Sequence, residues 1–185
     1  MNFNLVRQGV DVVPLLAEIE AHPELWGQQT ARLGVGSPHA QSTDIWVRYR
    51  DLDAYRDQHG LDMRAFCDEH ESVWLEPSAY LPSALLIARE IAGGDERLGG
   101  VLLTRLPAGG VIAPHVDGGW HAAAHEKFYV AVKVRTGAVF GFPDGDLRAS
   151  DGDVWHFRND VPHWVVNDSP EDRISMIVCV KKEAP

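Results

Sequence analysis

The chain has 185 residues, of which 45% are hydrophobic, and its formal net charge is −10 at pH 7. This length suffices for one domain with a buried core, so we expect residues 1–185 to form a single domain. A chain this acidic is a poor partner for nucleic acid or for an anionic membrane surface.

Membrane segments and cysteine motifs are both lacking in the sequence, and this bears on where the protein is found. No apolar run approaches transmembrane length, and the N-terminus lacks the pattern of a secretory signal. The two cysteines, Cys67 and Cys179, form no CxxC motif and suit buried thiols of a reducing compartment. We therefore expect a cytoplasmic protein that binds neither nucleic acid nor membrane.

The first part of the chain, residues 1–97, mixes helical signals with loops. Asp11 and Pro14 precede an apolar stripe, which predicts a helix that ends before Pro23. The Gly- and Ser-rich segment 33–43 indicates a loop. Further elements are predicted as an alternating strand over Ile45–Tyr49, a helix over Asp62–Glu71, and a helix over Pro82–Ala92 that Gly93-Gly94 ends.

From Leu98 the pattern becomes one of short strands separated by Gly, Pro and Asp turns. The predicted strands are Val101–Leu106, Val111–Asp117, Phe128–Arg135, Ala138–Phe142, Val154–Phe157, His163–Asn167 and Arg173–Val180. Several strands at this spacing are typical of a sandwich or barrel. We expect a mainly β fold, with a jelly-roll core over residues 98–182 and N-terminal helices that buttress one sheet.

His115 and Asp117 lie two positions apart at the end of a predicted strand, so alternation places both side chains on one face. A second histidine would complete a two-histidine, one-carboxylate set, which is diagnostic of non-haem Fe(II) oxygenases. His156 and His163 compete for that place, and we favour His163 because it opens an apolar strand after Pro162. The His-x-Asp motif alone also fits a surface turn or a plain His–Asp hydrogen bond.

Arg173 opens the strand that follows His163, and we expect the two strands to form a hairpin. A guanidinium in an apolar strand is costly to bury unless it meets a carboxylate, and its planar fork suits bidentate carboxylate binding. Ser175 shares its face and could donate another hydrogen bond. The alternative is that Arg173 pairs with Glu171 or Asp172 in the exposed turn.

The segment from Leu103 to Val180 resembles the aspartyl/asparaginyl β-hydroxylase family of Fe(II)- and 2-oxoglutarate-dependent dioxygenases. The resemblance rests on the motifs Gly109–Asp117, His125–Val130, Gly152–Phe157, His163–Asn167 and Asp172–Ile174, and less specifically on Ser37–His39 and Thr43–Arg48. It implies a double-stranded β-helix, which is a cupin-like jelly roll and agrees with the strand pattern.

The resemblance also implies roles for individual residues. His115 and His163 occupy iron-ligand positions, and Arg173 occupies the position that grips the distal carboxylate of 2-oxoglutarate. Lys127 or Tyr129 falls near further co-substrate contacts, although Tyr129 stands where a histidine is usual. Asp117 is a carboxylate that animal members lack and related bacterial hydroxylases keep, so we expect Asp117 to be a true iron ligand here.

The expected function is hydroxylation of a C–H bond by dioxygen, with Fe(II) as cofactor, 2-oxoglutarate as co-substrate, and release of succinate and CO2. The substrate would be an amino acid, an Asp/Asn-type residue in a peptide, or a small metabolite. Candidate substrate contacts are Arg48, His39, Trp120 and His121, although Arg48 also suits a surface charge and Trp120 a packing role.

Residues 118–124 contain paired glycines and small side chains and suit a lid. Two other functions fit the strand pattern: a cupin-type metalloenzyme that does not use 2-oxoglutarate, and a non-catalytic jelly-roll binding module. The first more often uses a His-x-His pair and leaves Arg173 without a role. Co-substrate binding and metal content would separate the three.

Overall fold

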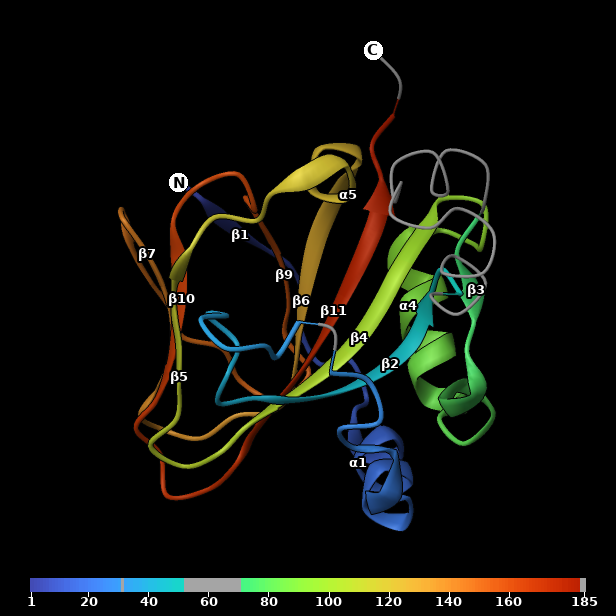
Figure 1. Ribbon diagram of the computed structural model, residues 1–185, viewed down its shortest axis with the longest axis horizontal. Helices are drawn as coiled ribbons and strands as arrows, with labels where there is room; N and C mark the ends of the chain where they lie inside the picture. The colour runs from blue at the N-terminus through green and yellow to red at the C-terminus, as the bar shows by residue number, and fades with distance from the viewer. Residues whose placement is uncertain (31, 52–70, 184–185) are drawn as a thin grey trace.

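Two facing β-sheets form the body of the molecule in a computed structural model that describes residues 1–30, 32–51 and 71–183 (Figure 1). Within this part of the chain the larger sheet has the strand order β1-β9-β6-β11-β4-β2-β3 and the smaller sheet the order β5-β10-β7-β8. Neighbouring strands are antiparallel throughout. The fold is mainly β and is a jelly roll, as the sequence predicted.

The elements have the following bounds. The strands are β1 Phe3–Arg7, β2 Thr43–Tyr49, β3 Val73–Trp74, β4 Leu98–Leu106, β5 Val111–His115, β6 His125–Lys133, β7 Ala138–Phe142, β8 Gly145–Leu147, β9 Val154–Phe157, β10 His163–Asn167 and β11 Arg173–Lys181. The helices are α1 Val13–Ala21, α4 Pro82–Ala92 and α5 Gly119–Ala124, with 3-10 turns η1 Pro23–Leu25 and η2 Glu76–Ala79.

Strand β11 lies at the centre of the larger sheet, and its two faces contact different parts of the molecule. Met176 and Val178 are fully buried on the face toward the helices. Ser175 and Ile177 lie on the opposite face, toward the smaller sheet. This separation follows directly from strand alternation, and it divides the apolar residues into two cores.

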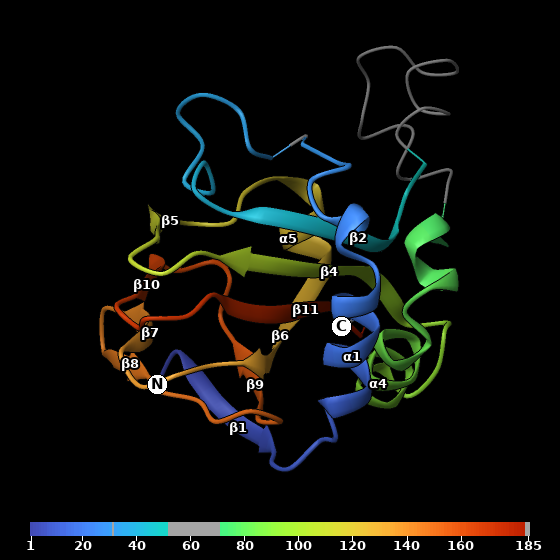
Figure 2. The same cartoon turned by 90° about the horizontal axis from the view of Figure 1, so that it is seen from below.

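The first core lies between the larger sheet and helices α1 and α4, which cover its outer face (Figures 1 and 2). Leu15 of α1 and Ala84 and Ala88 of α4 are fully buried there. Helix α4 begins with Pro82 and ends at Gly93, whose φ of 72° is the left-handed conformation that glycine adopts without strain. Helices therefore buttress one sheet, as predicted.

The second core lies between the two sheets and is rich in aromatic rings. Phe140 stacks on Phe142 at 4.8 Å and meets Phe157 edge-on at 5.0 Å. Tyr129, only 1% exposed, meets Phe140 edge-on from the larger sheet. These rings fill part of the space between the sheets, and Tyr129, Phe140 and Phe157 also line the cavity that occupies the rest of it.

The observed elements differ from the sequence predictions in three places. Strand β5 ends at His115, so Asp117 lies beyond the strand, where its backbone N–H donates to the carbonyl of Asn159. The segments 163–167 and 173–181 form no hairpin, because β10 pairs with β5 and β7 while β11 pairs with β4 and β6. The connection between them crosses from one sheet to the other.

The third difference concerns β2, whose burial does not follow a simple alternation. An irregularity between Trp46 and Arg48 shifts its register against β4 and changes which face the following residues occupy. The N-terminal part also contributes β1, β2 and β3 to the larger sheet. Of the helix predicted over 62–71, all but Glu71 lies outside the described residues, and so does Cys67. Among the described helices, each is too short to span a membrane.

Candidate metal centre

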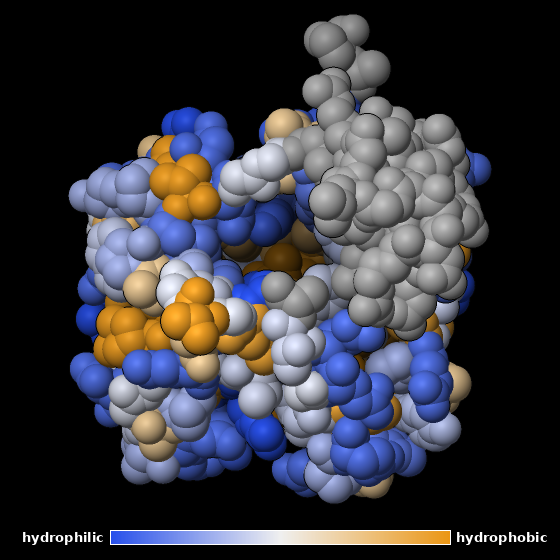
Figure 3. Space-filling view, viewed as in Figure 1, coloured by the Kyte–Doolittle hydropathy of each residue, from blue (hydrophilic) through white to orange (hydrophobic). Residues whose placement is uncertain are grey.

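A cavity of about 360 Å³ lies between the two sheets. Its walls come from both sheets, from the loop that precedes β2, and from the segment around α5. A hollow with hydrophobic side chains at its floor is visible near the middle of the face shown in Figure 3. The volume is at the lower end of the range for small-molecule sites, about 300–1,000 Å³.

His115, Asp117 and His163 meet in this cavity, each offering a ligand atom within 4.8 Å of the others. The Nε2 atoms of His115 and His163 lie 3.7 and 3.8 Å from the Asp117 carboxylate oxygens. Register explains the meeting, because His163 of β10 is paired directly with His115 of β5. Asp117 then turns back toward both rings from the residues after β5.

Backbone carbonyls fix the orientation of both histidines. The Nδ1–H of His115 donates to the carbonyl of Ala113 at 2.8 Å, and that of His163 donates to the carbonyl of Val161 at 2.9 Å. A carbonyl can only accept, so Nδ1 carries a proton in each ring, and in the neutral form of the ring the Nε2 lone pair is the one available to a metal ion. Both Nε2 atoms are on the side of Asp117, and a backbone carbonyl that holds the other ring nitrogen is the usual arrangement for a metal-binding histidine.

Asp117 is held ionised by a neighbouring cation. Lys127 of β6 donates from Nζ to Asp117 Oδ2 at 2.6 Å. Burial alone would raise the pKa of Asp117, but the charge and hydrogen bond of Lys127 together lower it below its ordinary value. Because Lys127 occupies Oδ2, the other carboxylate oxygen remains for a metal ion.

The donor set fits a divalent transition metal. It consists of two imidazole nitrogens with free lone pairs and one ionised carboxylate. Burial lowers the pKa of His163, so its ring is neutral at neutral pH, as a metal ligand must be. A two-histidine, one-carboxylate set of this kind suits Fe(II) with open coordination positions.

Arg173 is a buried cation in the same cavity, with only 3% of its surface exposed. Its Nη1 contacts Ser175 Oγ at 3.4 Å, and its guanidinium lies over the Tyr129 ring at 5.0 Å. No carboxylate of the described residues lies within ion-pair distance of it. Glu171, the alternative partner, pairs instead with Lys133 and Arg135.

A carboxylate ligand in the cavity would therefore satisfy Arg173. The face predicted from alternation is present, because Arg173, Ser175, Ile177 and Cys179 all line the cavity. Tyr129 stays a neutral phenol, since burial raises its pKa. This end of the cavity fits the distal carboxylate of 2-oxoglutarate by charge and by hydrogen-bonding chemistry.

The competing histidine, His156, lies elsewhere. It is on β9, where its Nδ1 contacts Asn4 Oδ1 at 3.2 Å and its ring contacts Phe128. Phe128 packs against the helix-side core, while Phe157, next along β9, lines the cavity. Alternation therefore keeps His156 away from the triad.

Three of the four candidate substrate contacts line the cavity: His39, Arg48 and His121. The ring of His39 meets that of His115 edge-on at 4.8 Å. Arg48 is buried, donates to the carbonyl of Leu98 at 3.3 Å and lies over the Trp74 ring, which excludes a surface charge. The side chain of Trp120, within α5, lies outside the described part of the chain.

Sequence reasoning missed two cavity residues, Arg32 and Thr104, and the buried Asp44 that binds both of them. The Arg32 Nε and Nη2 atoms donate to the two Asp44 oxygens at 2.5 and 2.8 Å, and Nη2 also donates to Thr104 Oγ1 at 2.7 Å. Asp44 is fully buried in β2. A carboxylate inside an apolar strand signalled a buried cation, but its partner on a distant loop carried no signal.

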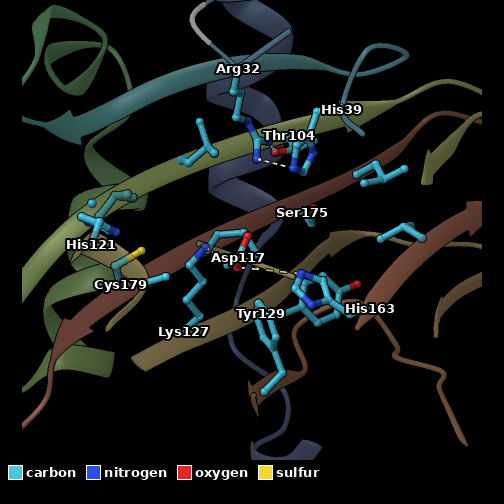
Figure 4. A pocket seen from close by; sticks show the side chains of 18 of the residues that line it. Arg32, His39, Thr104, Asp117, His121, Lys127, Tyr129, His163, Ser175 and Cys179 are labelled. Atoms are coloured by element: carbon cyan, nitrogen blue, oxygen red, sulfur yellow. Dashed lines mark hydrogen bonds and ion pairs between the residues drawn. The ribbon is translucent and has the colours of Figure 1, made fainter. Parts of the chain in front are cut away.

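Figure 4 shows how these groups surround the cavity. Arg32, His39 and Thr104 appear on one side of Asp117, and Lys127 and Tyr129 appear on the other. Because Arg32 and His39 come from the loop before β2, while Lys127 and Tyr129 come from β6, the two sides belong to different parts of the fold.

Comparisons with known proteins agree with this geometry. A family model described as aspartyl/asparaginyl β-hydroxylase matches residues 74–183, more than half of the chain. The match begins after Ser37–His39 and Thr43–Arg48, so it does not extend to these two segments. A search of curated protein sequences found no match.

Several solved structures share the fold. An oxidoreductase of the 2OG-Fe(II) oxygenase family from Burkholderia pseudomallei superposes with a TM-score of 0.62 at 11% identity, covering 98% of this chain and 85% of the other. The α-ketoglutarate-dependent epimerase SnoN from nogalamycin biosynthesis gives 0.58 at 17% identity, covering 98% and 76%. The viral collagen prolyl hydroxylase of Paramecium bursaria Chlorella virus-1 gives 0.54 at 12%, covering 99% and 97%.

At these identities the structural likeness establishes the fold, and the family match establishes the family. The comparisons favour an enzyme that uses 2-oxoglutarate over the two alternatives, a cupin-type enzyme without this co-substrate and a non-catalytic binding module. The chain belongs to the aspartyl/asparaginyl β-hydroxylase family and is a 2-oxoglutarate-dependent dioxygenase.

Proposed function

We propose that this dioxygenase hydroxylates a C–H bond of a small-molecule or peptide substrate, with Fe(II) held by His115, Asp117 and His163. The observation that carries the proposal is the convergence of two imidazole lone pairs and one ionised carboxylate within 4.8 Å. The substrate is an amino acid, an Asp/Asn-type residue in a peptide, or a small metabolite, and dioxygen is the oxidant.

In this proposal 2-oxoglutarate lies with its distal carboxylate at Arg173. The buried guanidinium lacks a carboxylate partner among the described residues, and Ser175 lies beside it on the same strand. Tyr129 packs under the guanidinium and limits its movement. Lys127 supplies further positive charge near the triad and contacts the co-substrate once a metal ion has neutralised Asp117.

When bound, Fe(II) and 2-oxoglutarate supply the chemistry: one oxygen atom of dioxygen enters the substrate, and 2-oxoglutarate leaves as succinate and CO2. The protein's own residues position and protect the reactants. The carbonyls of Ala113 and Val161 fix the histidine rings, and Lys127 holds the second oxygen of Asp117. Phe140 and Phe157 line the cavity and exclude water from the triad.

The substrate lies on the remaining side of the cavity. His39, Arg48 and His121 line it, and Trp120 belongs to the adjoining helix α5. The segment 118–124, predicted as a lid, includes α5, and its movement stays a prediction. These assignments define which side chains to change once a substrate is in hand.

The proposal is tested by measuring metal and co-substrate binding directly. Anaerobic calorimetry should show that 2-oxoglutarate binds only after Fe(II) is added, because the iron supplies part of its binding site. Succinate formation under air, with ascorbate and candidate substrates, is the second readout. Wild-type protein that neither binds 2-oxoglutarate with Fe(II) nor forms succinate would show the proposal to be wrong.

Variants of the triad test each ligand. His163→Ala and Asp117→Ala should each weaken Fe(II) binding at least about tenfold, since each removes a direct ligand. His156→Ala is the matched control and should leave Fe(II) binding unchanged. Retained iron and turnover in Asp117→Ala would show that this chain works with two histidines only.

A further inference from the structure

The Arg32 guanidinium is fixed at the cavity wall in an orientation that leaves one edge available. Its Nε and Nη2 atoms are occupied by Asp44 and Thr104, which are 0% and 3% exposed. Thr104 Oγ1 also donates to Asp44 at 3.0 Å, so the acceptor side is held as well. Among the residues that the structure describes, the Nη1 group has only a long contact with His39 Nε2, 3.5 Å.

This edge lies beside the candidate metal centre. Arg32 contacts His39, whose ring meets the ring of His115 edge-on at 4.8 Å. Arg32 itself is part-buried, with 26% of its side chain exposed, and it lines the cavity. A ligand beside the triad can therefore reach Nη1 without displacing Asp44 or Thr104.

The described cavity wall carries a surplus of positive charge, although the chain as a whole is acidic. Its charged side chains are four cations, Arg32, Arg48, Lys127 and Arg173, against Asp117 in the wall and Asp44, which pairs with Arg32 from behind the wall. Two positive charges therefore remain in excess. Fe(II) would add two positive charges, and 2-oxoglutarate would add two negative ones.

We propose that the substrate is a small carboxylate-bearing molecule and that the Nη1 edge of Arg32 donates to its carboxylate. This inference rests on the proposed function, because it places the carboxylate beside the triad in a site loaded with iron and 2-oxoglutarate. The charge surplus that remains after loading favours an anion over a neutral molecule. The cavity volume, shared with 2-oxoglutarate, favours a small free acid over a peptide chain.

The alternative role for Arg32 is structural, since a fully buried Asp44 needs a cation in any case. The two roles predict different results with matched ligands. A structural ion pair is indifferent to the charge of the substrate, whereas a binding residue distinguishes a carboxylate from the corresponding carboxamide.

The test uses wild-type protein with Fe(II) and 2-oxoglutarate under anaerobic conditions. Calorimetry measures binding of the L-amino acids and of C4 and C5 dicarboxylic acids, each beside its carboxamide, and of a capped peptide that contains aspartate. We expect at least one free acid to bind about 10- to 100-fold more tightly than its amide, the ratio of a charged hydrogen bond. The same acid should stimulate succinate release under air.

A double variant isolates Arg32 from its structural role. Arg32→Met with Asp44→Leu removes the ion pair as a unit and leaves no unpaired buried charge. It should bind the acid about 10- to 100-fold more weakly, with unchanged affinity for the amide and for 2-oxoglutarate. Arg105→Met is the matched control. Arg105 follows Thr104 on β4, but its guanidinium lies over the Trp26 ring and does not line the cavity.

Each result decides between the alternatives. Equal binding of acids and amides, binding of the capped peptide alone, or unchanged acid affinity in the double variant would overturn the proposal. Binding of 2-oxoglutarate with no binding of any tested acid would overturn it as well while leaving the proposed function intact. Failure of 2-oxoglutarate itself to bind the Fe(II)-loaded protein would contradict the proposed function, and with it the proposal made here.

Discussion

At the scale of single residues, buried charge is the feature that most separates this site from the surrounding core. Arg173 is almost fully buried with no carboxylate partner among the described residues, whereas the exposed Arg135 pairs with Asp151 and Glu171. A protein designed by packing alone would place an apolar side chain at position 173. Its guanidinium is explained by a ligand that brings the missing charge.

Arg173→Leu should therefore weaken the binding of 2-oxoglutarate without lowering the stability of the ligand-free protein. We expect 2-oxoglutarate affinity to fall at least about 30-fold, because a buried charge pair loses one partner. The ligand-free protein should be no less stable than wild type, since an unpaired buried cation is removed. Calorimetry and urea unfolding measure the two effects.

Arg135→Leu provides the comparison for that experiment. It removes a guanidinium from an exposed cluster outside the cavity and should leave 2-oxoglutarate affinity unchanged. If Arg173→Leu lost stability by several kcal/mol without ligand, Arg173 would be a structural residue and the co-substrate assignment would be wrong.

At the scale of elements, the smaller sheet positions the histidines. Strand β10 carries His163 between β5 and β7, and its next residue, Trp164, pairs with Gly141 of β7. A Cβ atom built on Gly141 would lie 2.2 Å from the Trp164 ring. Only glycine permits this close approach, so the strand pair beside His163, the proposed metal ligand, depends on it.

Gly141→Ala should therefore disturb the fold and the site together. The Trp164 ring would have to move, at a cost of about 1–3 kcal/mol for an overpacked core position. The displaced β10 should also bind Fe(II) more weakly through His163. Thermal unfolding and metal titration give the two readouts.

Gly34→Ala is the control for the added methyl group, because a Cβ there meets nothing within 4 Å and the backbone is not left-handed. Its melting temperature and metal affinity should equal those of wild type. Equal behaviour of Gly141→Ala would mean that β7 and β10 tolerate separation, which would contradict the account given for the smaller sheet.

At the scale of the whole molecule, an acidic chain encloses a cavity with an excess of positive charge. His121 shows the consequence for stability. Burial first, and then the charges of His125, Lys127 and Arg50, lower its pKa from 6.5 to about 3. Between these values the unfolded chain binds a proton that the folded chain does not, so stability is lost as the pH falls below about 6.5.

His121→Gln should reduce that acid sensitivity. One pKa unit corresponds to about 1.4 kcal/mol, so wild type should lose about 2 kcal/mol more than the variant between pH 6.5 and about pH 5. Urea unfolding at several pH values measures the difference, and the two curves should run parallel above about pH 7. Parallel curves over the whole range would show that His121 is not a buried neutral group.

The sequence by itself determined the local geometry. Alternation along residues 173–180 placed Arg173 and Ser175 on one face, and the structure has both in the cavity. The helix over Pro82–Ala92 and strands β7, β9 and β10 have the bounds that proline, glycine and hydrophobic spacing predicted, whereas β1, β3 and β8 were not predicted. These features depend on interactions between residues that are close in the sequence, so the order of the amino acids is enough to predict them.

The tertiary structure decided what distant segments share. It separated β10 and β11 into different sheets, chose His163 over His156 as the neighbour of His115 and Asp117, and brought Arg32 to the buried Asp44. No local pattern specifies these pairings, because sheet order and loop packing follow from the free energy of the whole core. The sequence therefore shows His115 and Asp117 as a motif, but only the fold brings His163 next to them.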